Sequence, residues 1–274
     1  MNSQRGNSAI QEKFRESSAP LFIPFITGGD PTPAATIDIA LALQEQGADI
    51  LELGVPYSDP LADGPTIQKA SARALANKVT IHDCIRLVGE MRRKGLHIPV
   101  ILFTYYNPVM QFGFHRLFEE MKREGLDGLL VPDLPLEETQ EIKSITKDYD
   151  IPLISLVAPT SKQRVQKIAQ QAEGFLYCVS SLGVTGARAQ FAEGIEEFLQ
   201  EVRSHCRVPI AVGFGISTPE QMKALAPHSD GLIVGSALVR VIEEVGSQLM
   251  NENTKDNGLQ EIKRFVQTLK CGVR

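Results

Sequence analysis

The chain has 274 residues, of which 43% are hydrophobic and 22% charged, a composition typical of a folded protein with one large or two small domains. A net charge of −5, with no basic run longer than three residues, argues against binding to nucleic acids or anionic membranes. No apolar stretch approaches the roughly 18 residues of a membrane span, and the polar N-terminal stretch lacks a signal core, so we expect a cytoplasmic protein. The four cysteines show no CxxC spacing and are expected to be reduced thiols.

Eight short apolar runs are predicted to be β-strands. Most are continuous Leu-, Ile- or Val-rich runs, which is typical of parallel strands whose outer face is covered by helices. Alternate strands are entered through a proline, at positions 24, 99, 152 and 209, and we place each of these prolines at the beginning of its strand. The others mostly follow a small or acidic residue, so a fourfold repeat is present. The predicted strands are Leu21–Thr27, Asp49–Leu53, Val100–Phe103, Gly128–Val131, Leu153–Val157, Phe175–Val179, Ile210–Val212 and Gly231–Val234.

Helical patterns separate these strands, and eight β/α units over this length favour a closed (β/α)8 barrel that takes up residues 1–274 as a single domain. An extra N-terminal helix is expected to close the bottom of the barrel, and a second additional helix lengthens the second connection. We predict a loop at Asn251–Gly258, before the last helix. The predicted helices are Ala9–Glu16, Pro33–Gln46, Val79–Lys94, Phe114–Arg123, Leu136–Lys147, Lys162–Gln171, Phe191–Ser204, Pro219–Leu225 and Leu259–Leu269.

The stretch LELGVPYSDPLADGPTIQ, residues 51–68, places Glu52 inside an apolar strand and Asp63 in a loop with proline and glycine. If Leu51 and Leu53 pack on the helices, Glu52 points into the barrel mouth, where desolvation raises its pKa and allows it to act as acid and base. Asp63 is expected to be held by the adjacent turn and to be better hydrated. Two carboxylates in unlike surroundings suit acid–base chemistry. The alternative, a Glu52 ion pair and a helix-capping Asp63, stays open on the residues alone.

Chemistry in such a barrel lies at the C-terminal ends of the strands. Neither lysine nor histidine is found at the predicted strand ends. The missing lysine argues against a Schiff-base aldolase, and the missing histidines argue against a metal site and against a Ser–His pair.

Glycine-rich loops follow the last three predicted strands. They contain Gly186, Gly215, and Gly235 with Ser236, the last pair opening a helix. Backbone N–H groups at glycines and helix N-termini bind anions, and the loops after strands seven and eight are the usual phosphate site of this barrel. We favour a phosphate site over simple turn geometry. Tyr177, in the sixth strand, either presents its hydroxyl to the mouth or packs in the core.

In these residues the chain resembles the alpha subunit family of tryptophan synthase, from about Phe14 to the C-terminus. The resemblance implies a (β/α)8 barrel that cleaves indole-3-glycerol phosphate to indole and glyceraldehyde 3-phosphate. The matching motifs are LELGVPYSDPLADGPTIQ at residue 51, PFITGGDP at 24, NPV at 107, VPDLPLEE at 131, GVTGAR at 183, GFGIS at 213 and VGSA at 234. The residues implied are Glu52, Asp63 and Tyr177 for catalysis, Gly186, Gly215, Gly235 and Ser236 for phosphate binding, and Phe25 for the indole pocket.

The resemblance also implies that this chain holds no cofactor of its own and no metal. It implies a tryptophan synthase beta subunit as partner in an alpha2beta2 assembly, with pyridoxal phosphate in that partner. Some members carry an arginine where this chain has Ser181, so loop-closing contacts of that arginine are not carried over.

Three other functions stay open on the sequence. Another phosphate-binding barrel, such as an indole-glycerol phosphate synthase or a sugar-phosphate isomerase, is expected to offer a lysine or a second strand-end acid, which we do not find. The second alternative is a barrel that mainly activates a partner enzyme, and the third is an unpartnered lyase that releases free indole. Both differ from a partnered lyase of the tryptophan synthase alpha type only in surface contacts and rates.

Overall fold

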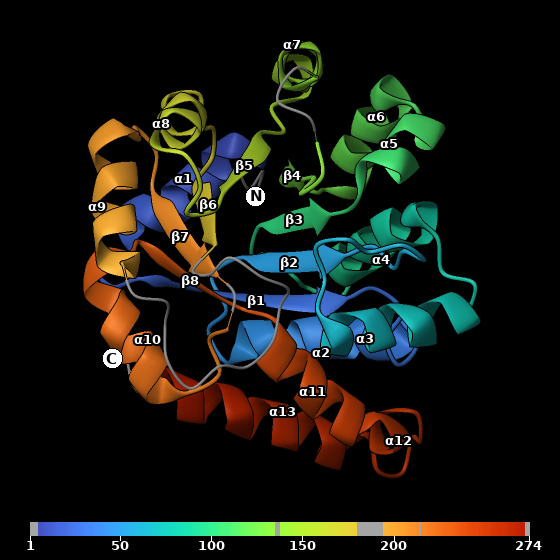
Figure 1. Cartoon of the computed structure of the whole chain (residues 1–274). Coiled ribbons are helices and arrows are strands. Elements are labelled where there is room, and N and C mark those ends of the chain that lie inside the picture. Colours follow the sequence, from blue (N-terminus) through green and yellow to red (C-terminus); the bar gives the residue numbers. More distant parts are fainter. Residues whose placement is uncertain (1–4, 135–137, 180–193, 214, 272–274) are drawn as a thin grey trace.

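The computed structural model describes residues 5–134, 138–179, 194–213 and 215–271 (Figure 1). Eight parallel strands pair in sequence order, and β8 pairs with β1, so the sheet closes into a barrel. The predicted fold class is therefore confirmed. The strands are β1 Leu21–Thr27, β2 Leu51–Gly54, β3 Val100–Phe103, β4 Gly128–Leu130, β5 Leu153–Val157, β6 Leu176–Val179, β7 Ile210–Gly213 and β8 Gly231–Val234.

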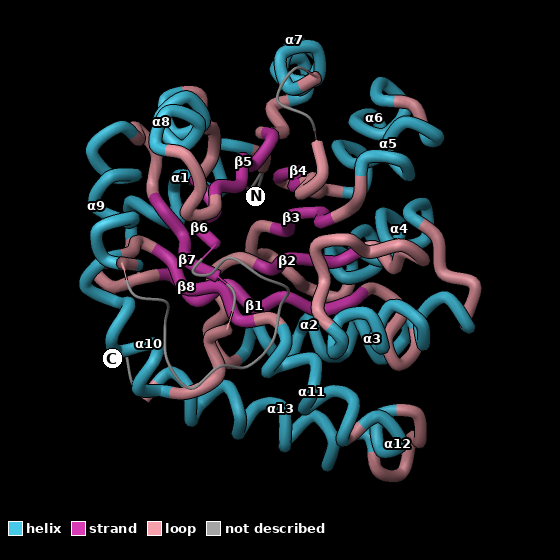
Figure 2. The backbone as a smooth tube through the Cα atoms, viewed as in Figure 1, coloured by secondary structure: helices cyan, strands magenta, loops and turns pink. Residues whose placement is uncertain are grey.

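Helices form a layer around the outside of this barrel (Figure 2). The N-terminal helix α1 places Ile10 in the cluster inside the barrel, so it closes one end as expected. The helices are α1 Asn7–Glu16, α2 Pro33–Glu45, α3 Pro65–Ala76, α4 Ile81–Arg93, α5 Tyr106–Phe112, α6 Phe114–Glu124, α7 Thr139–Tyr149, α8 Lys162–Gln170, α9 Ile195–His205, α10 Pro219–Leu225, α11 Ser236–Glu244, α12 Gly246–Leu249 and α13 Lys255–Lys270, with a 3-10 turn at Ala226–His228.

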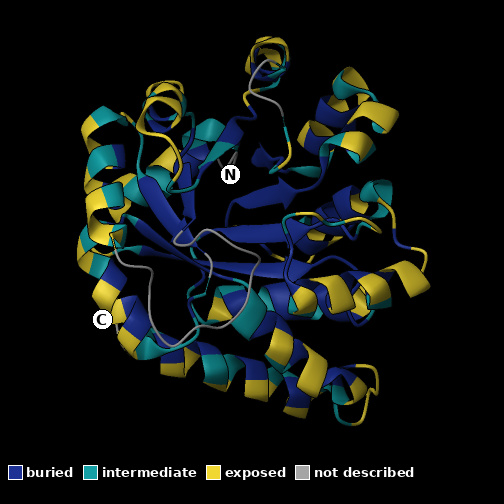
Figure 3. Ribbon diagram, in the orientation of Figure 1, coloured by how far each residue is buried: buried dark blue, intermediate teal, exposed yellow. Residues whose placement is uncertain are grey.

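Successive residues of each strand point to opposite sides of the barrel wall. Phe25 lies in the inner cluster, and its neighbour Ile26 lies in the outer cluster, between the strands and the helices. On β2, Leu51 and Leu53 belong to the outer cluster, which leaves Glu52 on the inner side. Figure 3 shows buried strands at the centre and helices that are buried only on their inward faces.

The fourfold repeat has a hydrogen-bonding basis at the strand entries. The carboxylates of Asp49, Asp127 and Asp230 each accept a backbone N–H from the first residues of the preceding strand, over 2.8–2.9 Å. The prolines that precede β3, β5 and β7 each accept a backbone N–H from the neighbouring strand through their carbonyl oxygens. Pro24 differs, because it lies inside β1 rather than at its beginning, so that prediction was wrong for one of the four.

Several helices differ from the predictions. The second connection contains α3 as well as α4, and the loop predicted at residues 251–258 ends early, because α13 begins at Lys255. Gly258, predicted to lie in that loop, is a packing residue of α13: a Cβ there would lie 3.1 Å from Leu249 on α12. The predicted starts of two helices, at Leu136 and Phe191, lie outside the described residues. Within the described part of the chain, no helix is long and apolar enough to cross a membrane.

Candidate active site

The strand ends surround one cavity at the C-terminal mouth of the barrel. All the residues predicted for the site lie in its lining except Gly186, which is outside the described residues. Three apolar residues that the sequence did not single out complete the cavity: Ile67, Phe103 and Ile233. The lining residues are Phe25, Glu52, Asp63, Ile67, Phe103, Tyr177, Gly215, Ile233, Gly235 and Ser236.

Glu52 occupies the apolar floor of this cavity. Its backbone lies between Phe25 on β1 and Ile101 on β3, and only 1% of the residue is exposed. Its Oε1 atom is buried without a hydrogen-bond partner. Desolvation by burial raises the pKa of Glu52 to about 8, because the ionised form loses its hydration. Glu52 is therefore protonated at neutral pH and can donate a proton to a bound molecule.

Asp63 stands across the cavity in the loop that leads into α3. It is 7% exposed against 1% for Glu52, so it is the better hydrated of the two carboxyl groups, as expected, although it too is buried. The hydroxyl of Tyr105 donates a hydrogen bond to Asp63 Oδ2 over 2.9 Å. Burial raises the pKa of Asp63 to about 6, and the Tyr105 hydrogen bond opposes that rise. Asp63 is therefore ionised at pH 7 while Glu52 is not.

Tyr105 is the polar group of this site that the sequence analysis missed. Its hydroxyl also accepts the backbone N–H of Ala62 over 3.1 Å, and its ring stacks on Tyr57 with centroids 5.0 Å apart. It lies two residues after the end of β3, and the signal that could have found it was its position among the strand-end residues. Tyr105 fixes both the backbone and the carboxylate of the Asp63 loop.

Tyr177 packs its ring over Gly213 on the next strand. A Cβ at Gly213 would lie 2.6 Å from Cζ of Tyr177, closer than side chains approach one another. Burial and the charges of Glu52 and Asp63 keep the pKa of the Tyr177 hydroxyl well above its usual value. The hydroxyl therefore stays protonated at the cavity wall, beside both carboxyl groups.

The predicted phosphate elements lie on the β7 and β8 side of the cavity. Gly215 has a φ of +88°, a left-handed conformation that favours glycine. Gly235 precedes Ser236, the first residue of α11, so backbone N–H groups of a helix N-terminus face the mouth. A Cβ at Gly235 would meet Phe25 at an ordinary 3.6 Å, so packing within the chain does not demand a glycine there.

A network of ion pairs joins α3, the helix after the Asp63 loop, to α11, the helix that begins at Ser236. Arg73 on α3 donates to both carboxylate oxygens of Asp30 over 2.7 and 3.0 Å and to Glu243 on α11 over 2.8 Å. Asp30 follows β1 and is 3% exposed. The helix after Asp63 and the helix that begins at Ser236 are thus tied together at a distance from the cavity.

Among the residues that the structure describes, no group of three or more His, Cys, Asp or Glu could hold a metal ion.

Comparison with known proteins gives one family. The family model described as tryptophan synthase alpha chain matches residues 11–274. The chain is 56% identical to the tryptophan synthase alpha chain of Geobacillus stearothermophilus over 250 residues, which are 91% of this chain and 93% of that one. Its structure is similar to that of Mycobacterium tuberculosis tryptophan synthase, with a TM-score of 0.85, 31% identity and 99% of each chain covered. It is also similar to the tryptophan synthase alpha-subunit of Pyrococcus furiosus, with a TM-score of 0.81, 35% identity, and 91% of this chain and 97% of that chain covered.

Proposed function

The chain belongs to the tryptophan synthase alpha chain family, lyases that cleave indole-3-glycerol phosphate to indole and glyceraldehyde 3-phosphate, and we propose that Glu52 and Asp63 carry out this cleavage. The alpha chain uses no cofactor, and pyridoxal phosphate belongs to the beta chain of the enzyme. An aldol cleavage needs an electron sink, and the substrate's own indole ring can supply one. The protein then has to move protons and hold charge.

The proposed mechanism begins with protonated Glu52, which gives its proton to the ring carbon that bears the glycerol chain. The ring becomes an indoleninium, and ionised Asp63 stabilises the positive charge at the ring N–H. The Glu52 carboxylate next accepts the proton of the adjacent hydroxyl group. The carbon–carbon bond breaks toward the ring, which releases neutral indole and the aldehyde, and Glu52 is again protonated.

Apolar and backbone groups orient the substrate in this proposal. Phe25 and Phe103 pack edge to face, with ring centroids 5.5 Å apart, and offer a flat apolar surface for the indole. The phosphate binds backbone N–H groups at Gly215, Gly235 and Ser236, and at Gly186 in the loop outside the described residues. Tyr177 contacts the substrate between these two ends.

The observation that carries the proposal is the buried, unpartnered carboxyl oxygen of Glu52 opposite an ionised Asp63. The pH profile of kcat/KM tests it, because this profile reports the pKa values of the free enzyme. We expect a bell with an acid limb near 6 from Asp63 and an alkaline limb near 8 from Glu52. The Asp63→Asn variant should lose most of the cleavage activity, and its pH profile should lack the acid limb. An alkaline limb that persists in Glu52→Gln would assign the acid to another group.

We infer that the mouth of the barrel docks on a tryptophan synthase beta subunit in an alpha2beta2 assembly. Two large apolar side chains near this mouth are exposed, Leu61 at 82% and Met110 at 55%. Exposed apolar side chains next to an active site are typical of a protein interface. Residues 107–111 lie in helix α5, so Met110 is presented from a helix rather than from a loop.

Asp59 provides the test of this interface, because it lies in the loop before Asp63 and its carboxylate accepts a hydrogen bond only from the neighbouring Ser58 among the described contacts. Asp59→Lys should weaken association with a beta subunit, measured by titration calorimetry, and leave the uncoupled cleavage rate near that of the wild type. Unchanged association would remove Asp59 from the interface. No complex with the wild type would favour a free-standing lyase, and negligible cleavage without the beta subunit would favour an activator.

We further propose that residues 1–274 form one domain and that the protein works in the cytoplasm. Packing of α13 against α2 and of Ile10 inside the barrel supports the single domain, since both ends of the chain join one core. The four cysteines are free thiols, which supports a reducing compartment.

A further inference from the structure

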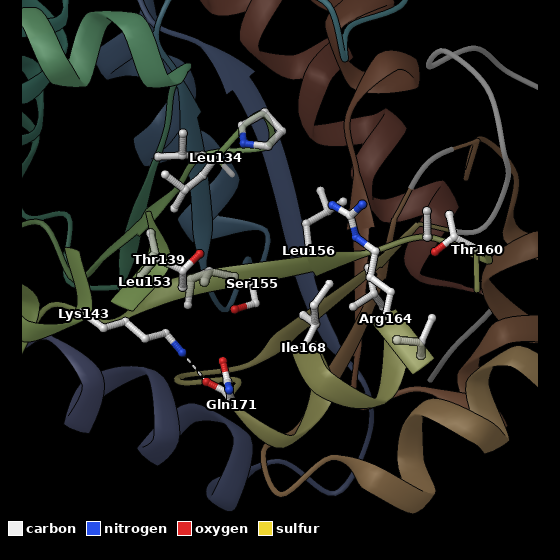
Figure 4. Close-up of a pocket in the computed structure, with 16 residues that line it drawn as sticks. Leu134, Thr139, Lys143, Leu153, Ser155, Leu156, Thr160, Arg164, Ile168 and Gln171 are labelled. Carbon is white, nitrogen blue, oxygen red and sulfur yellow. Dashed lines mark hydrogen bonds between the residues drawn. The ribbon is translucent and has the colours of Figure 1, made fainter. Parts of the chain in front are cut away.

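A second cavity lies on the side of the barrel, between β5, α7 and α8 (Figure 4). Its volume is about 290 Å³, close to the lower end of the range for small-molecule sites, roughly 300–1,000 Å³. Among the described residues, none of those that line it also lines the cavity of Glu52 and Asp63. It is therefore a separate space, and the cleavage reaction does not account for it.

The cavity exists because the barrel wall is incomplete at this point. β4 pairs with β5 only at Leu129–Leu153 and Leu130–Ile154, whereas β5 continues to Val157 beside β6. Helix α7 packs on α6 and α8 packs on α9, and β5 lies between them (Figure 1). The middle of β5, at Ser155 and Leu156, is consequently only half buried.

The charged groups of this cavity are both cationic. Lys143 on α7 is 6% exposed, and its ammonium donates a hydrogen bond to the backbone carbonyl of Gln171, as Figure 4 shows. Arg164 on α8 stands at the exposed side. No Asp or Glu is among the described lining residues, although the chain as a whole carries a net charge of −5. Among the described residues, the nearest carboxylate to Lys143 is that of Glu173, outside the lining, at 4.0 Å and partly exposed.

The remaining wall is apolar with one hydroxyl at its centre. Leu134, Leu156 and Ile168 line the space, and the Ser155 side chain lies between the two cationic residues in Figure 4. The buried ammonium of Lys143 has one hydrogen bond and one ion pair at 4.0 Å, and an anion in the cavity would add the charge-assisted hydrogen bonds that water otherwise gives. An apolar body on that anion would displace water from the leucine and isoleucine side chains.

We propose that this cavity binds a small organic anion with an apolar body, whose carboxylate or phosphate is held by Lys143, Arg164 and Ser155. The anionic head lies toward Lys143, and the apolar body lies along Val165 and Ile168, which belong to the same outer side of β5 as Ser155. The site is distinct from the site of cleavage, so a bound anion does not compete with the substrate.

Titration calorimetry with 3-phenylpropionate tests this site, with the catalytic cavity saturated by the uncharged ligand indole-3-propanol, which lacks the anionic head that the side cavity would bind. The matched neutral probe is 3-phenylpropan-1-ol, which has the same apolar body. We expect saturable binding of the acid, at least tenfold tighter than binding of the alcohol, since hydrogen bonds to charged groups are the stronger ones. No binding of the acid, or equal affinity for the two probes, would overturn the proposal.

Three variants locate the site. Lys143→Met keeps the length of the side chain without its charge and should weaken binding of the acid about tenfold or more. Ser155→Phe fills the cavity and should abolish binding of both probes. Lys162→Met, which removes an exposed lysine of α8 outside the cavity lining, is the control and should change nothing. Retained cleavage activity in each variant reports folding, and retained affinity in Lys143→Met or Ser155→Phe would place the probe elsewhere.

Discussion

The two ends of the barrel both bury carboxyl groups but surround them differently. At the strand entries, the Asp127 carboxylate accepts backbone N–H groups of Gly6 and Val100 and a guanidinium N–H of Arg92, each over 2.8–2.9 Å. At the mouth, Oε1 of Glu52 has no partner. Burial raises the pKa of both groups, but Arg92 and the two N–H groups oppose the rise at Asp127, and nothing opposes it at Glu52.

Within a single fold, the carboxylates at the strand entries thus contribute to stability, whereas the carboxyl group of Glu52 at the mouth is available for chemistry. A carboxylate that is fully hydrogen-bonded holds strands and helix α1 in place and has no capacity left for a ligand. A carboxyl group without partners destabilises the fold when it ionises, but it can exchange protons with whatever enters the cavity. The following substitutions test this contrast.

Glu52→Gln should lower kcat by more than about 100-fold, because the amide can neither give nor take the proton. Substrate binding should persist, since the amide has the same shape. The measurement is indole release from indole-3-glycerol phosphate, with the dissociation constant of a substrate analogue as control. Retention of more than a few per cent of the activity would contradict the role of Glu52.

The same variant should be more stable than the wild type. The pKa of Glu52 is about 8 in the folded protein against an ordinary value of 4.5, so the unfolded chain loses this proton first as pH rises. Stability is therefore full below about 4.5, falls between these two values and stays low above 8. We expect Glu52→Gln to unfold with roughly 2–4 kcal/mol more free energy than the wild type at pH 8 in urea, and with little difference at pH 4.5.

Asp127→Asn should have the opposite pattern. It leaves the guanidinium of Arg92, which is 12% exposed, without its anionic partner, and we expect a loss of about 3 kcal/mol in the free energy of unfolding. The kcat of the folded protein should stay near that of the wild type, because the site is at the other end of the barrel. Asp230→Asn is the milder comparison, since that carboxylate is 35% exposed. An equal loss of unfolding free energy in Asp127→Asn and Asp230→Asn would show that burial of the Asp127 carboxylate does not cause the destabilisation.

Gly213→Ala should lower kcat/KM about tenfold, because the new methyl group displaces the Tyr177 ring toward the carboxyl groups. A double-mutant cycle with Tyr177→Ala separates this effect from general misfolding. Once the ring is absent, the alanine at position 213 should cost little. Additive losses would mean that Gly213 acts independently of Tyr177.

Tyr105→Phe should have the smallest effect, a loss of about three- to tenfold in kcat/KM at pH 7. Without the hydroxyl, the pKa of Asp63 rises further, so the acid limb of the pH profile should move to higher pH. Tyr57→Phe is the matched control, because it removes a hydroxyl from the ring stacked on Tyr105 without touching Asp63. An unmoved acid limb in Tyr105→Phe would show that this hydrogen bond does not set the ionisation of Asp63.

The sequence predicted the barrel because its signals are local. Leucine and valine runs, entry prolines and entry aspartates each depend on a few neighbouring residues, and all eight strands were found. The inward direction of Glu52 also followed from alternation along one strand. Errors arose where packing overrides a local signal, as at residues 255–258, where a polar stretch predicted to be a loop begins α13 and Gly258 permits contact with Leu249.

The environment of Asp63 could not be predicted, since it depends on a residue 42 positions away. Tyr105 reaches the loop from the next strand, and no local pattern couples the two. The same holds for Arg73, whose partners Asp30 and Glu243 are brought together only by the closed barrel. The side cavity also escaped prediction, because it results from the short pairing of β4 with β5.

The Arg73 network has a consequence for which substrates the site accepts. Arg73 joins the helix that follows Asp63 to the helix that begins at Ser236 and to the loop after β1. In the proposed binding mode, these two helices carry the anchors for the ring and for the phosphate. We therefore expect a homologue of indole-3-glycerol phosphate with one carbon more or less in its chain to reach one anchor but not both, so that the span between the anchors would contribute to substrate selection.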